Sequence, residues 1–582
     1  MKRKLQDFPE EQRNVKQKIH ATDLKNYMQK DHIVDLLKKS IIPISNSNGF
    51  TTFIMNKGCE FEQELVKYIN NYKCKVISVG SYCEKNIKKT INLMKQGIPI
   101  IHSAPLKNNL NNTGGTADLL VRSDYLHKII NECPLSANEQ KIKSPTLGFH
   151  FHYVVIDIKF TTIPLRSDGR HILNIGMFPS YKAQTLIYND ALSLIQGYKS
   201  RYTYILGRRW KYNNKYGNFF SLECLDKLGV IDYQGVDKDY IKRTKDAVKW
   251  IKSINETKIK DIKGSPPLGI YPNMCVDAGV WNREKQIIAD NIGDITNLWF
   301  CGPKNRDIAL KNGITSWRDK RCNSKTVGIK GIRAKTLNAI IKINHQNKIK
   351  IMPKKIKNTL IRKYDTISEI YVDFETLSDI FSPFTELPKQ EKTDMIFMIG
   401  VGWDSNGVWN YKNFTCNKST LDEEFRIMND FTTFMKDNKV KTKFFWNADK
   451  RFWDTAERRQ FDRLAADKDT EDRKDIISDE WKLHLNNWID LCEIFKKEPV
   501  VIKDCFNFGL KNIANSMYKH KLISTKIESE CSNGLMASIN AWKEYQTNPD
   551  AINSLVIKDI MKYNEFDCKV MWDILNYLRK NH

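Results

Sequence analysis

The sequence lacks the features that mark several classes of protein. Its 582 residues include no apolar run of about 18, the length that a membrane-spanning helix needs. Residues 1–25 are polar and charged, without the apolar core of a secretory signal. The 13 cysteines form no CxxC pair, so no close-spaced zinc motif is present. We therefore expect an intracellular, non-secreted protein that has no membrane partner and whose thiols are reduced.

Acidic residues are also scarce relative to basic ones. The chain has 94 Lys and Arg against 68 Asp and Glu, which gives a formal net charge of +26. An excess of this size favours a nucleic acid as the partner and makes such binding salt-dependent. The same excess also follows from AT-rich codons, which supply Lys, Asn and Ile. Charge alone leaves both explanations open.

Length and composition predict a multi-domain α/β protein. Residues 1–25 are expected to form a charged tail, 26–265 a first α/β domain, 266–360 a basic helical segment and 361–582 a second α/β domain. The glycine spacing of the helical segment resembles a helix-hairpin-helix turn, although a plain helical spacer fits it better. Residues 342–363 contain eight Lys or Arg and no carboxylate, which predicts a linker or a solvated basic face.

Hydrophobic spacing predicts four elements in the first domain. Apolar residues four apart between 61 and 69 predict a helix that carries Glu62. Residues 152–163 are β-branched and alternate in polarity, which is typical of a strand. A helix is expected at 182–198 and a further strand at 201–210.

The first group of candidate residues centres on Asp157 and Lys159. These residues are two apart on the predicted strand, so their side chains point the same way. A carboxylate at such a position can hold Mg²⁺ or Mn²⁺, which prefer oxygen ligands. An ammonium group beside it can orient the attacking water and offset charge that develops on phosphorus.

Four other polar residues extend this group. Asp118 follows the small residues GGTA, which predict a turn that a nucleic-acid backbone can approach closely. Glu62 can complete a metal shell from the early helix. Gln184 and Tyr188 are four apart on the predicted helix and therefore share one face.

The order Glu, Asp, DxK and QxxxY across roughly residues 55–210 resembles the RecB-type branch of the PD-(D/E)XK nucleases. The segments TINLMKQGIPII and LIQGYKSRYTYILGR add to this resemblance. It implies metal-dependent cleavage with Glu62, Asp118 and Asp157 as ligands, Lys159 as catalytic lysine, and Gln184 and Tyr188 as substrate-positioning residues. One class of relatives adds a cysteine cluster for an iron–sulfur centre. This sequence has no such cluster, so we expect no iron–sulfur cofactor.

The second domain is expected to begin with three strands, at 369–377, 395–403 and 408–416, followed by a helix at 421–437. This order and length fit an RNase H-like layer of mixed sheet and helices.

The second group of candidate residues lies at the two ends of this domain. Asp373 and Glu375 are two apart on the first predicted strand, so both carboxylates can bridge metal ions. Tyr563 and Asp567 are four apart on the predicted C-terminal helix, and the phenol can orient a water. DFET and YxxxD match the first and third motifs of the DnaQ-like (DEDD) exonucleases.

The middle motif of that family is less regular here. The segment FFWNADKRFWDTAERR is similar to the divergent RNase H-like domain that follows RecB-type nucleases in some fused chains. That similarity implies Asp449 as the acid, with Phe445 where a His is common and Asp454 as second choice. Asp490 is expected to support the site rather than to bind metal.

These resemblances imply a metal-dependent nuclease, expected to be an exonuclease, with two centres that act on DNA in replication, repair or recombination. No GxxxxGK[ST] motif is present, so the chain carries no P-loop motor, and a separate helicase is a candidate partner. Two alternatives stay open. One is a nucleic-acid-binding scaffold with an inactive centre, and the other is an RNA-processing exonuclease.

Overall fold

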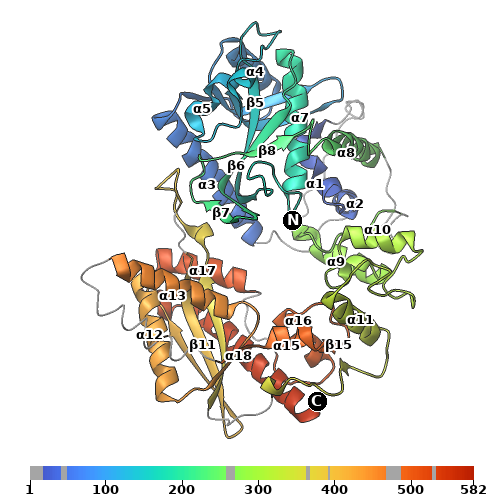
Figure 1. Ribbon diagram of the computed structural model, residues 1–582, viewed down its shortest axis with the longest axis vertical. Coiled ribbons are helices and arrows are strands. Elements are labelled where there is room, and N and C mark those ends of the chain that lie inside the picture. The colour runs from blue at the N-terminus through green and yellow to red at the C-terminus, as the bar shows by residue number, and fades with distance from the viewer. Residues whose placement is uncertain are drawn as a thin grey trace, which may run out of the picture. The chain divides into compact units, whose positions relative to one another are not determined.

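The chain divides into two compact units in the computed structural model (Figure 1). Unit 1 comprises Met1–Ile288 with Pro383–Glu391, and unit 2 comprises Ala289–Ser382 with Lys392–His582. The structure describes residues 18–40, 49–256, 269–361, 368–390, 394–466, 481, 487–526 and 533–582. The boundaries expected near 265 and 360 differ from this division, because most of the middle segment packs within unit 2.

Unit 1 is built on an eight-stranded sheet with the main order β2-β3-β4-β5-β6-β7, while β1 pairs with β4 and β8 with β6. The strands are β1 Ile19–His20, β2 Val76–Ser78, β3 Ile100–Asn108, β4 Thr113–Arg122, β5 Tyr153–Pro164, β6 Tyr202–Asn214, β7 Gly217–Ser221 and β8 Gly229–Asp232. β3, β4 and β5 are antiparallel neighbours, whereas β5 and β6 run parallel. The two strands predicted in this domain are confirmed as β5 and β6.

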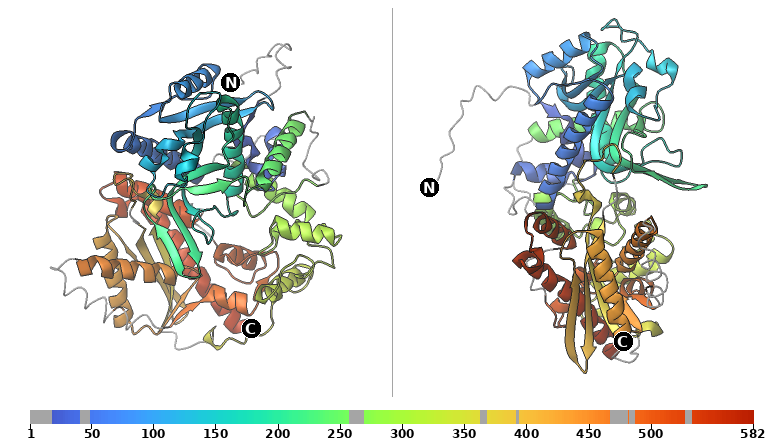
Figure 2. Two further views of the ribbon diagram at one scale, coloured as in Figure 1. Left: turned by 45° about the horizontal axis from the view of Figure 1, so that its top comes forward. Right: turned by 90° about the vertical axis from the view of Figure 1, so that its left-hand side faces the viewer.

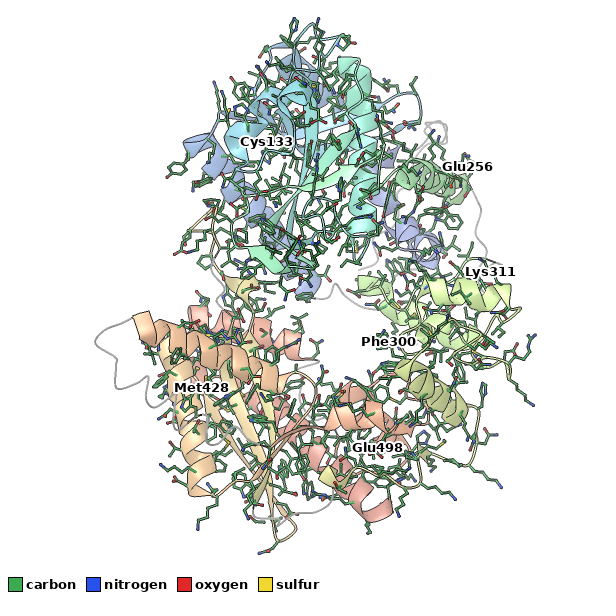
Figure 3. All side chains as sticks on the ribbon, viewed as in Figure 1. Cys133, Glu256, Phe300, Lys311, Met428 and Glu498 are labelled. Carbon is green, nitrogen blue, oxygen red and sulfur yellow. The ribbon has the colours of Figure 1, made fainter. Side chains whose placement is uncertain are left out.

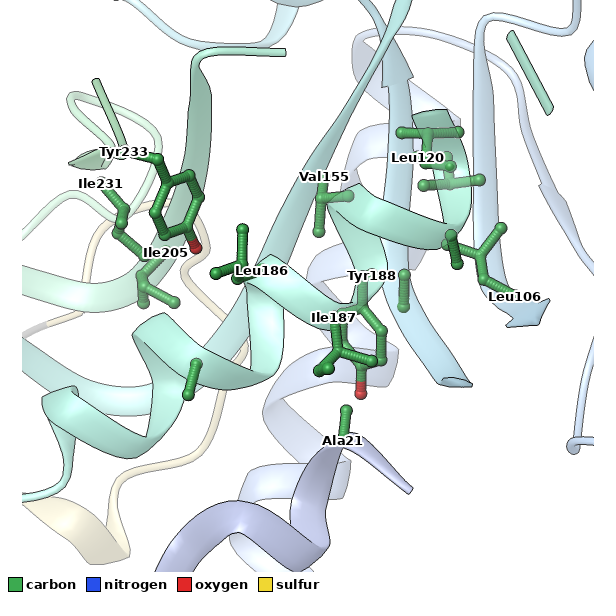
Figure 4. Close-up of a cluster of buried hydrophobic side chains, with 14 of the residues drawn as sticks. Ala21, Leu106, Leu120, Val155, Leu186, Ile187, Tyr188, Ile205, Ile231 and Tyr233 are labelled. Atoms are coloured by element: carbon green, nitrogen blue, oxygen red, sulfur yellow. The ribbon is translucent and has the colours of Figure 1, made fainter. Parts of the chain in front are cut away.

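Helices cover both faces of this sheet. The described α-helices up to Glu256 are α1 Lys25–Met28, α2 Ile33–Ser40, α3 Gly49–Tyr72, α4 Glu84–Lys95, α5 Leu126–Ile129, α6 Ala137–Gln140, α7 Phe178–Gln196 and α8 Asp239–Glu256. Leu186 and Ile187 of α7 pack with Val155 on one face (Figure 4), and α3 packs with Val154 and Ile156 on the other. Because both faces are buried, β5 is apolar at most positions, and its two charged residues stand out.

Unit 2 contains a five-stranded sheet with the order β12-β11-β10-β13-β14. Its strands are β10 Glu369–Leu377, β11 Met395–Ser405, β12 Val408–Thr415, β13 Thr442–Phe445 and β14 Trp488–Asp490. β10, β11 and β12 are antiparallel, and β13 and β14 continue the sheet in parallel with β10. The predicted strand at 369–377 is confirmed as β10, and those at 395–403 and 408–416 correspond to β11 and β12.

Helices pack on both faces of that sheet, and six described α-helices follow β10. They are α12 Leu421–Asp437, α13 Asp449–Ala466, α15 Leu491–Lys497, α16 Leu510–Lys519, α17 Gly534–Thr547 and α18 Leu555–Asn581. Phe374 of β10 meets Phe431 of α12 and Trp453 of α13. Met428 of α12, labelled in Figure 3, is fully buried. Because neighbouring strand residues alternate, the residues on either side of Phe374 face α18.

The described residues of the segment expected between the two domains, residues 266–360, are folded. It contains α9 Asn282–Ile292, α10 Pro303–Lys311, α11 Ile332–Asn344 and β9 Ile351–Met352, which pairs with β15 Val501–Ile502. The segment with the glycine spacing holds the short η5 Ile295–Asn297 and α10, and the helix after α10 begins at Ile332. The described part of 342–363 is not a free linker, since Ile343, Ile351 and Ile356 lie in the unit 2 core.

A short segment between β10 and β11 belongs to unit 1. Phe384 packs against Phe61 of α3 and Phe160 of β5. The backbone N–H of Cys224 donates to the carbonyl of Pro388 at 2.9 Å. The core of unit 1 is therefore completed by residues that come from far along the sequence. None of the described helices combines the length and apolar content needed to cross a membrane.

Candidate active sites

The first site lies where β4 and β5 run side by side. Lys159 places its Nζ 2.7 Å from Oδ2 of Asp157 and 3.7 Å from Oδ2 of Asp118. The same Oδ2 of Asp118 accepts the backbone N–H of Ile158 at 2.7 Å. The structure therefore brings together the DxK pair and the acid of the preceding strand, with Asp157 fully buried.

The helix α7 adds a polar pair to this site. Gln184 donates from Nε2 to Oδ1 of Asp157 at 3.4 Å and to Oη of Tyr188 at 3.0 Å. The turn predicted at GGTA is wrong, because Gly114 and Gly115 lie inside β4. A Cβ at Gly115 would lie 2.9 Å from the ring of Tyr188. Gly115 is therefore explained by the close approach of the Tyr188 ring from α7, not by a turn.

Glu62 reaches the site from α3 and pairs with a histidine. Oε1 of Glu62 lies 2.9 Å from Nε2 of His102, whose Nδ1 lies 2.9 Å from Oγ of Ser78. His102 is not among the predicted site residues, because an isolated histidine carries no spacing pattern. From β3, His102 contacts the Glu62 carboxylate and can hold its orientation.

Burial and crowding shape the charges of the first site. Burial raises the pKa of Asp118 well above its usual range, and the negative charges of Asp157 and Glu62 add to this shift. Burial also raises the pKa of Asp157, although Lys159 opposes the shift. Burial alone would lower the pKa of Lys159, but attraction to the two aspartates raises it overall. Lys159 is therefore a protonated cation at neutral pH.

The second site forms where β10 faces α18. Asn564 of α18 donates from Nδ2 to Oδ2 of Asp373 at 2.8 Å and to the carbonyl of the same residue at 3.1 Å. The hydroxyl of Tyr411 donates to Oδ1 of Asn564 at 2.9 Å. A Cβ at Gly400 would lie only 1.5 Å from that Oδ1, so β11 must carry glycine there. Asn564 thus fixes Asp373, and neither spacing nor motif pointed to it.

The two predicted residues of α18, Tyr563 and Asp567, lie at this second site as well. Tyr563 and Asp567 are buried beside Glu375. A Cβ at Gly534, the first residue of α17, would lie 3.8 Å from Oε2 of Glu375 and 3.9 Å from Oη of Tyr563. Nζ of Lys511 on α16 lies 3.9 Å from the centre of the Tyr563 ring. The positive charge of Lys511 opposes the rise in the pKa values of Asp373, Glu375 and Asp567.

The middle acid comes from the start of α13. Asp449 is buried, and its Oδ1 accepts the backbone N–H of Phe374 at 3.4 Å. Asn447 adopts a left-handed φ of 75°, and its N–H donates to Asp490 at 3.0 Å. This turn presents Asp449 to β10. Asp454 is about half exposed and pairs with Lys450 at 2.9 Å, away from the other acids.

A comparison with protein families identifies the second region. A family model described as RNase_H_2, of the RNase_H superfamily, matches residues 370–579. Within this span, the part that belongs to unit 2 is an RNase H-like domain. Such a domain indicates a nuclease-type activity on nucleic acid, and RNase H-like nucleases generally use divalent metals such as Mg²⁺. A search among curated proteins finds no match to the chain.

The acids of the RNase H-like domain fit a divalent cation. Oδ2 of Asp449 and Oδ1 of Asp567 are buried without a hydrogen-bond partner among the described residues. Buried carboxylate oxygens without donors are costly, and they are the ligands that Mg²⁺ and Mn²⁺ prefer. Within the described parts of the chain, no three or more His, Cys, Asp or Glu side chains are grouped closely enough to hold a metal ion as they stand. Asp373 is instead held by Asn564.

Burial raises the pKa values of these carboxyl groups. Burial raises the pKa of Asp449 to about 7 and that of Asp567 to about 6. For Asp373, burial and the charges of Asp449, Asp567 and Glu375 raise the pKa well above its usual range. Without metal, the folded domain therefore holds protons that an unfolded chain releases near pH 4.

These raised pKa values predict how the stability of the folded chain depends on pH. The pKa of each acid is raised on folding, so its contribution to stability is present below about pH 4 and is lost as pH rises toward about pH 7. In EDTA, the melting temperature of the full-length chain is expected to fall by several degrees between about pH 5 and about pH 7.5. The Asp449→Asn, Asp567→Asn double variant should show a flatter response. An unchanged pH response in that variant contradicts the prediction.

A second prediction concerns Asn564. Replacing it by alanine leaves the Tyr411 hydroxyl and Asp373 without their buried partner, a loss of about 1–3 kcal/mol in the free energy of unfolding. Nuclease activity of the RNase H-like domain should also fall, because Asp373 loses its fixed orientation. Asn581→Ala is the matched control, since Asn581 lies on the same helix and makes only an exposed bond to the Tyr577 carbonyl. Equal melting temperatures for the two variants would refute the role of Asn564.

Proposed function

We propose that this chain is a metal-dependent nuclease that hydrolyses phosphodiester bonds in DNA at two catalytic centres. The observation that carries the proposal is the convergence of acids from separate elements at each site. Asp118 and Asp157 meet Lys159 in unit 1, and Asp449 and Asp567 approach β10 in unit 2. Buried acids at such density are costly to the fold, so they indicate a site that is selected for chemistry.

In the RNase H-like centre, Asp373, Glu375, Asp449 and Asp567 would hold the metal. A divalent cation at this position supplies Lewis-acid activation and neutralises charge on the transferring phosphoryl group. The phenol of Tyr563 lies close to Glu375 and would orient the attacking water. Lys511 would offset negative charge beside that phenol. Asn564 and Tyr411 would keep Asp373 in place.

In the first centre, Glu62, Asp118 and Asp157 would hold the metal in a PD-(D/E)XK-type arrangement. The order α3, β3, β4, β5, α7, β6 and the position of each acid support this assignment. Lys159 is protonated at neutral pH, so it would orient water and stabilise the developing negative charge rather than accept a proton. Gln184 would fix Asp157 and, with Tyr188, position the substrate.

The choice of DNA rests on the resemblance of residues 55–210 to RecB-type nucleases, and the net charge of +26 is compatible with any nucleic acid. The test uses the full-length chain with end-labelled single-stranded DNA, duplex DNA and RNA of one sequence. Each substrate is incubated with Mg²⁺, Mn²⁺ or EDTA. Metal-dependent shortening of DNA is expected. Cleavage of RNA alone would instead support an RNA-processing exonuclease, and binding without cleavage would support a scaffold.

A further inference from the structure

The net positive charge of the chain is concentrated in one part of unit 2, residues 303–357, here called the lysine-rich segment. It contains 16 Lys or Arg and only two carboxylates, Asp307 and Asp319, which gives a net charge of +14. More than half of the charge of +26 therefore lies in fewer than one tenth of the residues. A codon bias acts along the entire chain and does not produce such a concentration. Positive charge at this local density favours a polyanion as the partner.

The two helices of the segment each present lysines on one side. In α10, Lys304, Ile308 and Lys311 are four and three residues apart and share a side of the helix, and all three are exposed. Lys311, labelled in Figure 3, is the last residue of this helix. Lys335 and Lys342 are seven apart on α11, so they also share a side, which is likewise exposed.

The loop between α10 and α11 joins these two sides. Asn312, just after α10, donates from Nδ2 to the carbonyl of Thr326 at 3.0 Å. The backbone N–H of Ser324 donates to Oδ1 of Asn338 on the exposed side of α11 at 2.7 Å. The loop therefore lies against both helices and adds its own lysines to their exposed sides. The resulting basic face comprises six exposed lysines: Lys304, Lys311, Lys325, Lys330, Lys335 and Lys342.

The charges of the basic face are not neutralised by the described residues of the chain. Among those residues, none forms an ion pair or a hydrogen bond with the ammonium group of any of the six lysines. Exposed lysines elsewhere in unit 2 do have carboxylate partners, as in the pairs Lys450 with Asp454 and Lys519 with Asp504. Like charges that share a surface repel one another, so the basic face is stabilised by an anion that binds it.

The basic face is attached to the RNase H-like domain. Oγ1 of Thr336, on the buried side of α11, donates to the carbonyl of Lys496 on α15 at 3.0 Å. Figure 2 shows the lysine-rich segment in yellow-green beside the orange α15. Further along, β9 pairs with β15, and the next helix, α16, carries Lys511 next to Tyr563 of the second centre. A nucleic acid on the basic face is therefore held on the same unit as that centre.

The side chains of the segment fit a duplex better than a single strand. Proteins that hold single strands stack the bases on exposed aromatic rings. The lysine-rich segment has no Tyr or Phe, and its one Trp, Trp317, is buried. A duplex covers its bases and displays its phosphates on the outside, with about one charge per 1.7 Å of axis. Lysines without aromatic rings match that phosphate surface.

We propose that the basic face binds the phosphate backbone of duplex nucleic acid. The proposal rests on the nuclease function proposed above, and it specifies the substrate as one with a duplex tract that is held on unit 2. Contacts to phosphates carry no sequence information, so this binding is independent of base sequence.

The test measures the salt dependence of binding, apart from cleavage. Fluorescence anisotropy in EDTA compares the full-length chain with its Lys304→Gln, Lys325→Gln, Lys335→Gln triple variant on labelled blunt duplex DNA over a range of salt concentrations. A plot of log affinity against log salt loses about 0.9 of its slope for each phosphate contact removed. The slope is therefore expected to become shallower by about three, and duplex affinity at low salt to fall about tenfold or more. Affinity for a single strand of the same sequence should fall less.

The matched control is the triple variant Lys418→Gln, Lys441→Gln, Lys543→Gln, which removes the same charge from exposed positions of unit 2 outside the segment. Melting curves check that every variant is folded. An unchanged slope and affinity in the basic-face variant, or an equal change in the control, overturns the proposal, even if the chain cuts DNA. A larger loss on the single strand than on the duplex overturns the assignment to a duplex. A selective loss of duplex binding in a chain that cuts no substrate supports the basic face and refutes the nuclease function.

Discussion

Asp373→Asn is expected to reduce cleavage by the RNase H-like centre by about a thousandfold or more, because a metal ligand supplies several kcal/mol of transition-state stabilisation. The substitution keeps the shape of the side chain, and its amide oxygen can still accept from Asn564. Removing one charge also relieves repulsion with Asp449 and Asp567. The variant should therefore be inactive at this centre and yet melt at a higher temperature in EDTA.

The measurement uses the Asp157→Asn background, so that the first centre does not contribute to cleavage. Asp454→Asn is the matched control, because Asp454 lies on the surface in a pair with Lys450. The control should cleave at the rate of its parent. If Asp373→Asn also cleaves at that rate, then the acids on β10 do not form a catalytic centre.

Lys159→Met is expected to cause a loss of similar size at the first centre. Methionine keeps much of the length of the side chain but removes the cation that lies between Asp157 and Asp118. Two buried carboxylates then face each other without a counter-charge, and the developing charge on phosphorus is no longer offset. Cleavage is measured in the Asp373→Asn background, and Lys159→Arg should retain part of the activity because it retains the charge.

Lys199→Met serves as the control for the loss of a lysine from unit 1. Lys199 is 45% exposed and pairs with Asp190 at the surface, so its removal should leave cleavage unchanged. Full activity in Lys159→Met would show that the DxK lysine is only structural. Both experiments use the full-length chain, because a chain cut near residue 360 would lose Phe384 from the core of unit 1.

The sequence predicted the elements that carry local patterns. Alternating β-branched residues marked β5, the segment EIYVDFETL marked β10, and spacing of two or four placed Asp157 with Lys159 and Tyr563 with Asp567. These patterns depend only on the repeat of a strand or a helix. The structure accordingly brings those residues together at the predicted elements.

Features that depend on contacts between distant segments were not predictable in this way. Asn564 and His102 act through contacts with residues far away in the sequence, and one Asn or one His carries no periodic signal. Gly115 resembled a turn residue because the sequence does not show that Tyr188 packs over it. Phe384 lies between two strands of the second sheet in sequence but packs in unit 1.

The choice between Asp449 and Asp454 likewise depends on contacts that the spacing of residues cannot predict. Both lie on one helix, and the irregular middle motif allowed either as the acid. The left-handed backbone at Asn447 and its bond to Asp490 favour Asp449, because they turn its side chain toward Phe374. Backbone strain of this kind is set by the assembled sheet and cannot be derived from spacing.

The most direct test of the account compares cleavage of end-labelled DNA by four full-length proteins in Mg²⁺ or Mn²⁺. They are the unmodified chain, Asp157→Asn, Asp373→Asn and the variant with both substitutions. Two independent centres predict that each single variant keeps part of the activity and that the double variant has none. Cleavage by the double variant at the rate of the unmodified chain would contradict the account, because neither cluster of acids would then be catalytic.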